Sequence, residues 1–227
     1  HLIADLDPLG IQKREEHSEL KPETYGFNKN DFSRKIFLDG VLGLQHANLE
    51  EIMEILTMRG QGNVEGLKEL ISSLPSNLVM SEIGCYAGLS TKIFMESGKV
   101  KTLYAIDIWE DVLNLFKSKW KDHNFKAVEA EFDKNLKGFN VIKLKMNAKE
   151  AQDHLPQLDF AYIDGNHHYE YVKEDIQICL KKIKNDGIIS GHDYCEESPG
   201  VIKAVNEMFG KPDKVFSDAS WIVKLKK

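Results

Sequence analysis

The chain has 227 residues, of which 42% are hydrophobic and 29% are charged, and its formal net charge at pH 7 is −6. This length and composition suit one well-cored domain with additional helices, and they exclude fibrous and low-complexity proteins. The acidic balance argues against a surface that coats nucleic acid, because phosphate binding needs a basic face. No apolar run reaches the roughly 20 residues that a membrane helix needs, and no signal-peptide pattern opens the chain.

The three cysteines point to a reducing environment. Cys85, Cys179 and Cys195 are odd in number and lack C-x-x-C spacing. We therefore expect neither a disulfide framework nor a thiolate zinc site, and we predict a cytoplasmic location.

The first third of the chain predicts an arm followed by a helical cap. Residues 1–30 are polar with scattered prolines and glycines, which is typical of irregular structure. Apolar residues at helical spacing predict helices near 49–60 and 64–74, and a weaker pattern covers 32–44. We expect residues 1–75 to form this arm and cap, which packs on the sheet or covers a substrate, and residues 76–227 to form the main α/β domain.

A glycine turn follows the first predicted strand of that domain. The strand begins at residues 78–80 and runs into SEIGCYAG at 81–88, and a helix is predicted over 89–95. Glycines at a strand-to-helix turn let the backbone approach a ligand closely, and the helix N-terminus offers unpaired N–H groups. Gly84 and Gly88 form G-x-x-x-G after Glu82, not the G-x-G-x-x-G fingerprint, so a nicotinamide cofactor is disfavoured. A tight turn without a ligand fits the glycine pair as well.

The next strand, residues 102–106, ends in an acidic residue. Asp107 stands about 20 residues after the glycine turn, where nucleotide-binding α/β folds place an acceptor for ribose hydroxyls. Trp109 suits the core better than a ligand shield. Charged residues 111–136 predict an outer helical layer, and a strand at 141–144 leads into a short helix that begins at Asn147.

Residues 159–194 hold most of the chemically interesting side chains. A short apolar strand at 160–163 ends at Asp164, apolar residues then recur at helical spacing to Ile183, and Asp186-Gly187 are expected to stop that helix before a strand at 188–189. Such a βαβ unit brings the carboxyl ends of its strands to one edge of the sheet. We therefore expect five side chains to converge in one crevice: Asp164, His167, His168, His192 and Asp193.

The remaining elements complete the fold class. Ser198 and Pro199 open another helix, and strands at 215–216 and 221–225 form a tight hairpin. Strands that alternate with helices before a terminal hairpin predict a doubly wound, mostly parallel sheet with an antiparallel edge.

Residues 78–224 resemble the class I S-adenosylmethionine-dependent methyltransferases. The resemblance implies a Rossmann-like, seven-stranded sheet with a C-terminal hairpin and S-adenosylmethionine as cofactor. The family's acidic residue and G-x-x-x-G motif match the glycine turn, and its ribose and adenine contacts match the ends of the next two strands. The cofactor-binding residues implied in this way are Glu82, Gly84, Tyr86, Gly88, Asp107, Ile108, Asn147, Ala148 and Asp164.

The motif D-G-x-H-x-Y at 164–169, followed later by H-D-Y at 192–194, is similar to metal-dependent O-methyltransferases of macrolides and nucleotide sugars. The resemblance implies that Asp164 and Asp193 ligate a divalent cation and that His167 acts as the base. His192 stands where that branch commonly has an acidic residue, so it either joins the metal ligands or orients a neighbour. Hard carboxylate ligands suit Mg²⁺ or Mn²⁺. The implied acceptor is a sugar hydroxyl, of a nucleotide-linked sugar bound for a surface glycan or natural product.

Two other functions stay open on the sequence alone. An iron-dependent hydroxylase-like enzyme would use His167 or His168 with His192 and Asp193 as a two-His-one-carboxylate site, but it leaves the glycine turn and Asp107 without a purpose. A catalytically silent module would keep the fold to bind a partner. We favour the enzyme with a small-molecule partner, no nucleic acid and no membrane span, and we leave a homo-oligomer open.

Overall fold

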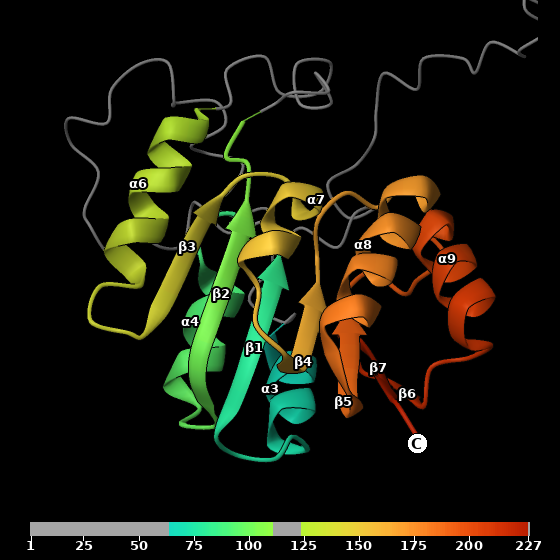
Figure 1. The fold of residues 1–227 in the computed structure, drawn as a ribbon. Coiled ribbons are helices and arrows are strands. Elements are labelled where there is room, and N and C mark those ends of the chain that lie inside the picture. Colours follow the sequence, from blue (N-terminus) through green and yellow to red (C-terminus); the bar gives the residue numbers. More distant parts are fainter. Residues whose placement is uncertain (1–63, 111–123, 227) are drawn as a thin grey trace, which may run out of the picture. The chain divides into compact units, whose positions relative to one another are not determined.

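The computed structural model describes residues 64–110 and 124–226 (Figure 1). The chain divides into two compact units, His1–Asp31 and Phe32–Lys227, and every described residue belongs to the second unit. The predicted arm, the helices expected before residue 64 and the helical structure expected over 111–123 lie outside the described residues.

In the described part of the chain, seven strands form one sheet in the order β3-β2-β1-β4-β5-β7-β6. The strands from β1 to β5 pair in parallel, whereas β7 is antiparallel to both β5 and β6. The predicted Rossmann-like sheet with a C-terminal antiparallel hairpin is thus confirmed. The strands are β1 Leu78–Ile83, β2 Val100–Asp107, β3 Val141–Lys145, β4 Leu158–Ile163, β5 Ile183–Gly191, β6 Lys214–Val215 and β7 Trp221–Lys224.

Helices cover both faces of the sheet (Figure 1). One apolar cluster joins α3, α4 and α6 to the sheet, and the other joins α7, α8 and α9 to it. Because both faces are covered, β1 and β4 are buried almost along their whole length. The helices are α3 Glu65–Ser72, α4 Leu89–Glu96, α6 Phe125–Asn135, α7 Ala148–Ala151, α8 Tyr169–Lys182 and α9 Pro199–Phe209, with a 3₁₀ turn η3 at Gln152–His154. None of these helices combines the length and apolarity required to cross a membrane.

The boundary between α8 and β5 differs from the prediction. The helix ends at Lys182, and Ile183 already pairs with Leu158 in the sheet. Asp186-Gly187 therefore do not stop the helix but lie within β5, where the register with β4 shifts. Polar residues followed by glycine occur at β-bulges as well as at helix ends, and the sequence pattern alone does not distinguish the two.

The start of α9 follows the prediction in position but not in detail. Pro199 is the first helical residue, as expected for a residue without an N–H donor. Ser198 precedes it, yet its hydroxyl makes no capping hydrogen bond. The helix is instead held by its buried face, which consists of Val201, Ala204 and Val205.

Candidate functional site

The carboxyl ends of the five parallel strands bring the predicted site residues to one edge of the sheet (Figure 1). The glycine turn follows β1, which lies between β2 and β4, so this turn is adjacent to both Asp107 and Asp164. The neighbouring strand β5 ends at Gly191 and delivers His192 and Asp193 beside Asp164. Four of the five side chains expected from the βαβ pattern therefore converge here, and His168 is the exception.

Left-handed backbone shapes the glycine turn. Gly84 and Gly88 have φ angles of 85° and 84°, a region that residues with a side chain rarely adopt. Space is equally restrictive, because a Cβ on Gly84 would lie 2.2 Å from the Asp164 carbonyl oxygen. A Cβ on Gly88 would lie 2.5 Å from the Leu136 side chain. The fold thus requires glycine at both positions of the G-x-x-x-G motif, whether or not a ligand binds.

The carboxylate of Asp107 holds this turn in place. Its Oδ2 accepts hydrogen bonds from the backbone N–H groups of Cys85 and Tyr86, each over 2.9 Å, and Oδ1 accepts one from Trp109 over 2.8 Å. Burial raises the pKa of the Asp107 carboxyl, while these bonds and one from the Ile108 backbone favour its charged form. A carboxylate offers about four acceptor positions, so a ribose would share Asp107 with the chain's own backbone.

Glu82 is fully buried in β1 and ties that strand to the helix after the turn. Its two carboxylate oxygens accept hydrogen bonds from the hydroxyls of Ser90 and Thr91 in α4. These two hydroxyls were not predicted from the sequence. Their positions at the start of a helix that directly follows the glycine turn are the signal that could have identified them.

Trp109 and the remaining predicted cofactor residues have distinct positions along this edge of the sheet. Trp109 is 2% exposed and its Nε1–H donates to the Tyr86 carbonyl over 2.8 Å, which confirms the core position favoured for it. Burial and the nearby Asp107 raise the pKa of the Tyr86 hydroxyl above its usual range. At the end of β3, Asn147 caps α7 by accepting from the Glu150 N–H, and α7 begins with a buried alanine, Ala148.

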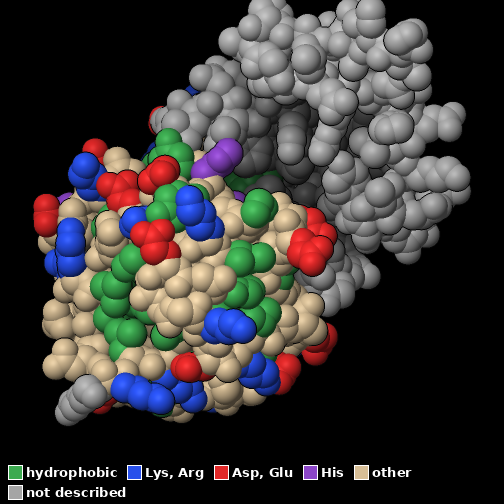
Figure 2. Space-filling model, turned by 90° about the vertical axis from the view of Figure 1, so that its right-hand side faces the viewer, with side chains coloured by type: hydrophobic (Ala, Val, Ile, Leu, Met, Phe, Trp, Pro, Cys, Tyr) green, Lys and Arg blue, Asp and Glu red, His purple; other side chains and the backbone are tan. Residues whose placement is uncertain are grey.

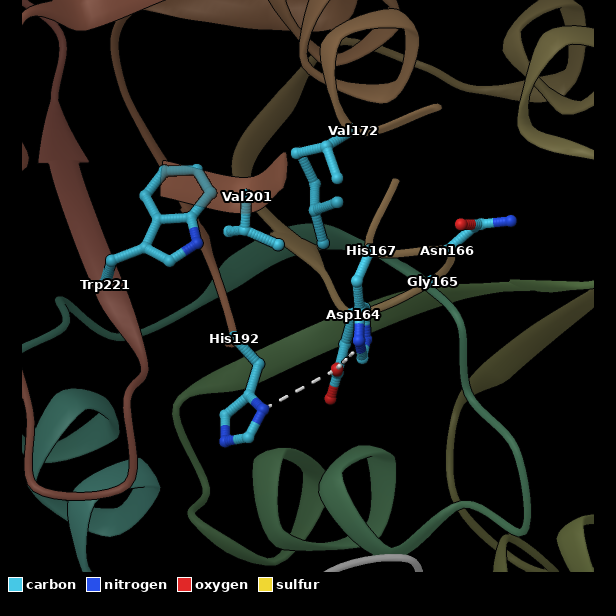
Figure 3. A pocket seen from close by; sticks show the side chains of 9 residues that line it. Asp164, Gly165, Asn166, His167, Val172, His192, Val201 and Trp221 are labelled. Carbon is cyan, nitrogen blue, oxygen red and sulfur yellow. Dashed lines mark ion pairs between the residues drawn. The ribbon is translucent and has the colours of Figure 1, made fainter. Parts of the chain in front are cut away.

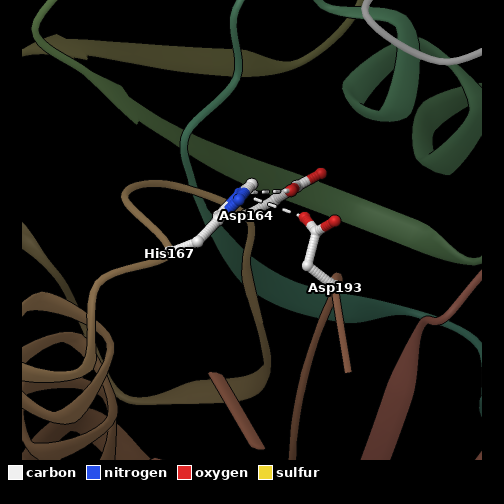
Figure 4. Close-up of side chains that lie close together, drawn as sticks. All are labelled: Asp164, His167 and Asp193. Carbon is white, nitrogen blue, oxygen red and sulfur yellow. Dashed lines mark ion pairs between the residues drawn. The ribbon is translucent and has the colours of Figure 1, made fainter. Parts of the chain in front are cut away.

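Asp164, His167 and Asp193 form a cluster whose ligand-capable atoms all lie within 4.8 Å of one another (Figure 4). The Nε2 atom of His167 is 3.0 Å from Asp193 Oδ2 and 4.0 Å from Asp164 Oδ1. The side chains of Asp164 and Asp193 are 16% and 22% exposed, and that of His167 is 45% exposed. The carboxylates are thus recessed while the imidazole stays accessible from solvent.

His192 lies beside Asp164 in a small pocket that His167 also lines (Figure 3). Its Nδ1 atom is 2.9 Å from Asp193 Oδ2 and 3.8 Å from Asp164 Oδ1, and its side chain is 11% exposed. Two imidazoles therefore contact the same Asp193 oxygen. The small pocket behind them is closed by the apolar side chains Val172, Val201 and Trp221.

His168 does not join the cluster. It is exposed and precedes the first residue of α8, and its backbone N–H donates to Asn166 Oδ1 over 2.9 Å. On the side of the molecule that carries α9, acidic and basic side chains are interspersed and histidine reaches the surface (Figure 2). The expected position of His168 in the crevice is therefore wrong, because its backbone turns into α8 and leaves the ring exposed.

The donor set of the cluster suits a hard divalent cation. Two carboxylates and one imidazole face a common point, and carboxylate oxygens are the ligands that Mg²⁺ and Mn²⁺ prefer. Because both carboxylates are recessed, fewer bulk water molecules can compete with them for a bound cation. The residues present therefore fit a cation of this class, with His192 close enough to orient Asp193.

A match to a known family decides the class of the protein. Residues 81–194, half of the chain, match a family model described as a methyltransferase domain. The chain belongs to this methyltransferase family. The matched range contains both the glycine turn after β1 and the carboxylate cluster after β4 and β5. Membership supports S-adenosylmethionine as the methyl donor.

Solved methyltransferase structures share the fold. The O-methyltransferase NovP has a TM-score of 0.53 at 16% identity, over 76% of this chain and 83% of NovP. The calicheamicin-biosynthesis enzyme CalS11, a TDP-rhamnose 3'-O-methyltransferase, has a TM-score of 0.51 at 13% identity, over 91% of this chain and 96% of that chain. A precorrin-6y C5,15-methyltransferase from Geobacter metallireducens has a TM-score of 0.51 at 18% identity, over 76% and 90%. These identities show the fold alone.

Curated relatives match a short segment only. The 2-oxoglutarate dehydrogenase E1 components of Brucella anthropi and Brucella ovis are each 53% identical to this chain over 57 residues. The segment is 25% of this chain and 6% of the relative, so the chain spans only a small part of these proteins. A match of this extent shows neither their family nor their activity for this chain.

Asp175 of α8, which the sequence analysis missed, lies under the Asp164-Gly165 turn. Its Oδ2 atom is 3.7 Å from the position of a Cβ on Gly165. Burial, and then the charge of Glu174, raises the pKa of the Asp175 carboxyl to about 7. Its position one helical turn before the buried Cys179 is the signal that could have indicated partial burial.

This raised pKa predicts a pH-dependent stability. Between about pH 4 and pH 7 the unfolded chain loses the Asp175 proton and the folded chain keeps it, so the free energy of unfolding falls as the pH rises. Asp175→Asn removes this loss and should exceed wild type by about 1–3 kcal/mol at pH 8, with little difference at pH 4. Urea denaturation across this pH range measures it.

Asp186→Asn, an exposed site in β5, is the matched control and should follow wild type at every pH. If the difference in the free energy of unfolding between Asp175→Asn and wild type does not grow as the pH rises, Asp175 is not protonated in the folded protein.

Proposed function

We propose that this protein is a divalent-metal-dependent O-methyltransferase that moves the methyl group of S-adenosylmethionine to a sugar hydroxyl of a small-molecule acceptor, specifically a nucleotide-linked sugar. One observation carries the proposal. The cluster of Asp164, His167 and Asp193 lies directly beside the glycine turn of a methyltransferase domain, with the Asp164 backbone in contact with Gly84. The D-G-x-H-x-Y resemblance supports the sugar acceptor, and the likeness to a TDP-rhamnose O-methyltransferase agrees with it at the level of fold.

In this proposal the cofactor lies along the carboxyl ends of β1 to β3. Glu82, Gly84 and Gly88, with Tyr86, hold the methionine part at the N-terminus of α4. Asp107 and Ile108 bind the ribose, and Asn147 and Ala148 flank the adenine. Asp164 closes the methionine end. Hydrogen bonds from the turn to Asp107 and from α4 to Glu82 support this arrangement, because they fix the backbone before a ligand arrives.

Asp164 and Asp193 are the proposed cation ligands. Bound there, a divalent cation would lower the pKa of a coordinated acceptor hydroxyl, next to the electrophilic methyl group that S-adenosylmethionine supplies. His192, which the sequence leaves open as a third ligand or an orienting residue, contacts Asp193 Oδ2 through Nδ1. It therefore serves either as a ligand or as the group that holds Asp193 in its orientation.

His167 is the proposed general base. Imidazole can accept a proton near neutral pH, and the exposed His167 ring can reach an acceptor that enters from solvent. The Asp193 carboxylate, 3.0 Å from Nε2, would stabilise the imidazolium that forms when His167 takes the hydroxyl proton. Proton removal and cation binding thus share one carboxylate.

Thermal stability with each ligand tests the cofactor and the cation separately. S-adenosylmethionine or S-adenosylhomocysteine should raise the melting temperature, since a ligand at 100 times its Kd stabilises the native state by about 2.7 kcal/mol. Mg²⁺ or Mn²⁺ should add a further increase. Asp164→Asn should lose most of the cation effect and keep the larger part of the cofactor effect, because the other proposed cofactor contacts remain.

Asp186→Asn is the control and should retain both effects. If S-adenosylmethionine leaves every variant unchanged, the cofactor assignment is wrong. If Asp164→Asn keeps the full cation effect, the metal assignment is wrong.

Replacing His167 should slow chemistry more than it weakens cation binding. His167→Gln is expected to lower the rate of methyl transfer to sugar nucleotides by about 10²–10⁴-fold, because it removes the proton acceptor. Label transfer from methyl-labelled S-adenosylmethionine, with and without chelator, measures this rate. A His167→Gln variant at full rate removes His167 as base, and turnover with iron and 2-oxoglutarate would support the hydroxylase instead.

A further inference from the structure

Gly200, the second residue of α9, packs directly against the backbone that carries His167. A Cβ on Gly200 would lie 2.4 Å from the His167 carbonyl oxygen, 2.7 Å from the Tyr169 nitrogen and 3.2 Å from the His168 carbonyl carbon. Side-chain carbons essentially never approach other atoms within 3.0 Å. All three contacts are backbone atoms, so they cannot rotate away as the end of a side chain could.

The glycine at this position is required by space rather than by backbone conformation. Its φ angle lies outside the left-handed region, where glycine would be favoured for its flexibility. Within a helix glycine is a poorer residue than alanine, so helix stability gives no reason for it either. The close approach of α9 to residues 167–169 is the remaining reason.

The turn that Gly200 contacts is fixed on its other sides as well. At its start, the Asp164 N–H donates to the Ile83 carbonyl over 2.7 Å. At its end, α8 begins at Tyr169 and is anchored by its buried face. On the surface, an ion pair of 2.6 Å between Lys173 and Glu207 joins α8 to α9. The backbone of His167 is therefore held between two packed helices.

Two further glycines make similar contacts with the same segment. A Cβ on Gly84 would lie 2.2 Å from the Asp164 carbonyl oxygen, and one on Gly191 would lie 2.4 Å from that of Ile163. The loop after β1, the end of β5 and the start of α9 thus all meet residues 163–169 at a glycine. Of the three, Gly200 is the one that contacts His167 itself.

We propose that Gly200 is a positioning residue. It lets α9 pack against the His167 carbonyl and so holds the imidazole against Asp193. We call this contact of Gly200 with the backbone of residues 167–169 the seat. This inference rests on the proposed function for the role of His167 as base. The seat acts through the backbone, because α9 is anchored independently by Val201, Ala204 and Val205. An added methyl group would move the 167–169 turn rather than detach the helix.

Gly200→Ala tests the seat, with Gly210→Ala as the control at the other end of α9. Gly210 has open space around its Cβ position but a φ angle of 82°, so alanine there strains α9 without touching the turn. In ¹H–¹³C imidazole spectra, with the His167 signal assigned by His167→Gln, Gly200→Ala should shift that signal and Gly210→Ala should not. An unmoved His167 signal in Gly200→Ala overturns the proposal.

Kinetics then show whether the seat matters for chemistry. Gly200→Ala should lower kcat for methyl transfer by about 10–100-fold, as a small misplacement of a catalytic group does, with S-adenosylhomocysteine affinity within twofold of wild type. Combined with His167→Gln, it should cause no further loss, because the seat acts only through His167. A full additional loss in the double variant contradicts this route.

The contact can also be tested without a variant that has to fold. In the wild-type protein, a nuclear Overhauser effect should join a Gly200 Hα proton to the Tyr169 amide proton, and its absence overturns the seat. If the contact and the spectral shift are present but no methyl transfer occurs with any acceptor, the seat stands and the proposed function is the part that fails.

Discussion

The close approach of β1 and β4 at their carboxyl ends is the constraint on which the site depends. The Asp164 N–H donates to the Ile83 carbonyl over 2.7 Å, and the residue that follows β1 is Gly84, where no space is left for a side chain. The glycine turn and the Asp164 turn are therefore fixed side by side by backbone contacts. Methyl transfer needs its two partners aligned, and a separation set by backbone is better defined than one set by flexible side chains.

Two acidic residues organise the backbone around this contact. Asp107 binds three N–H groups of the chain through direct hydrogen bonds, and Glu82 binds the hydroxyls of Ser90 and Thr91. The residues that the family resemblance assigns to the cofactor thus also fix the backbone of the glycine turn and the start of α4. Since buried charge is stable only when hydrogen-bonded, these partners keep the carboxylates in place whether or not a ligand is bound.

Local patterns predicted most of this arrangement. Apolar periodicity and polar strand ends were enough to place Asp107, Asp164 and Asp193 at one edge, because parallel strands deliver their ends to the same side. The predicted boundary between α8 and β5 was wrong, because the Asp186-Gly187 pair can mark a bulge in a strand as well as the end of a helix. The contact of Gly200 with His167 could not be predicted, because it joins residues on different elements through backbone atoms alone.

The proposed function requires a divalent cation that Asp164 and Asp193 hold beside the cofactor. Anomalous diffraction from a crystal grown with Mn²⁺ and S-adenosylhomocysteine can locate such a cation. We expect an anomalous peak at about 2.0–2.6 Å from carboxylate oxygens of both residues, with the cofactor sulfur on the side of the glycine turn. A bound cofactor with no peak at this cluster, or with Mn²⁺ held elsewhere, would contradict the proposed cation site.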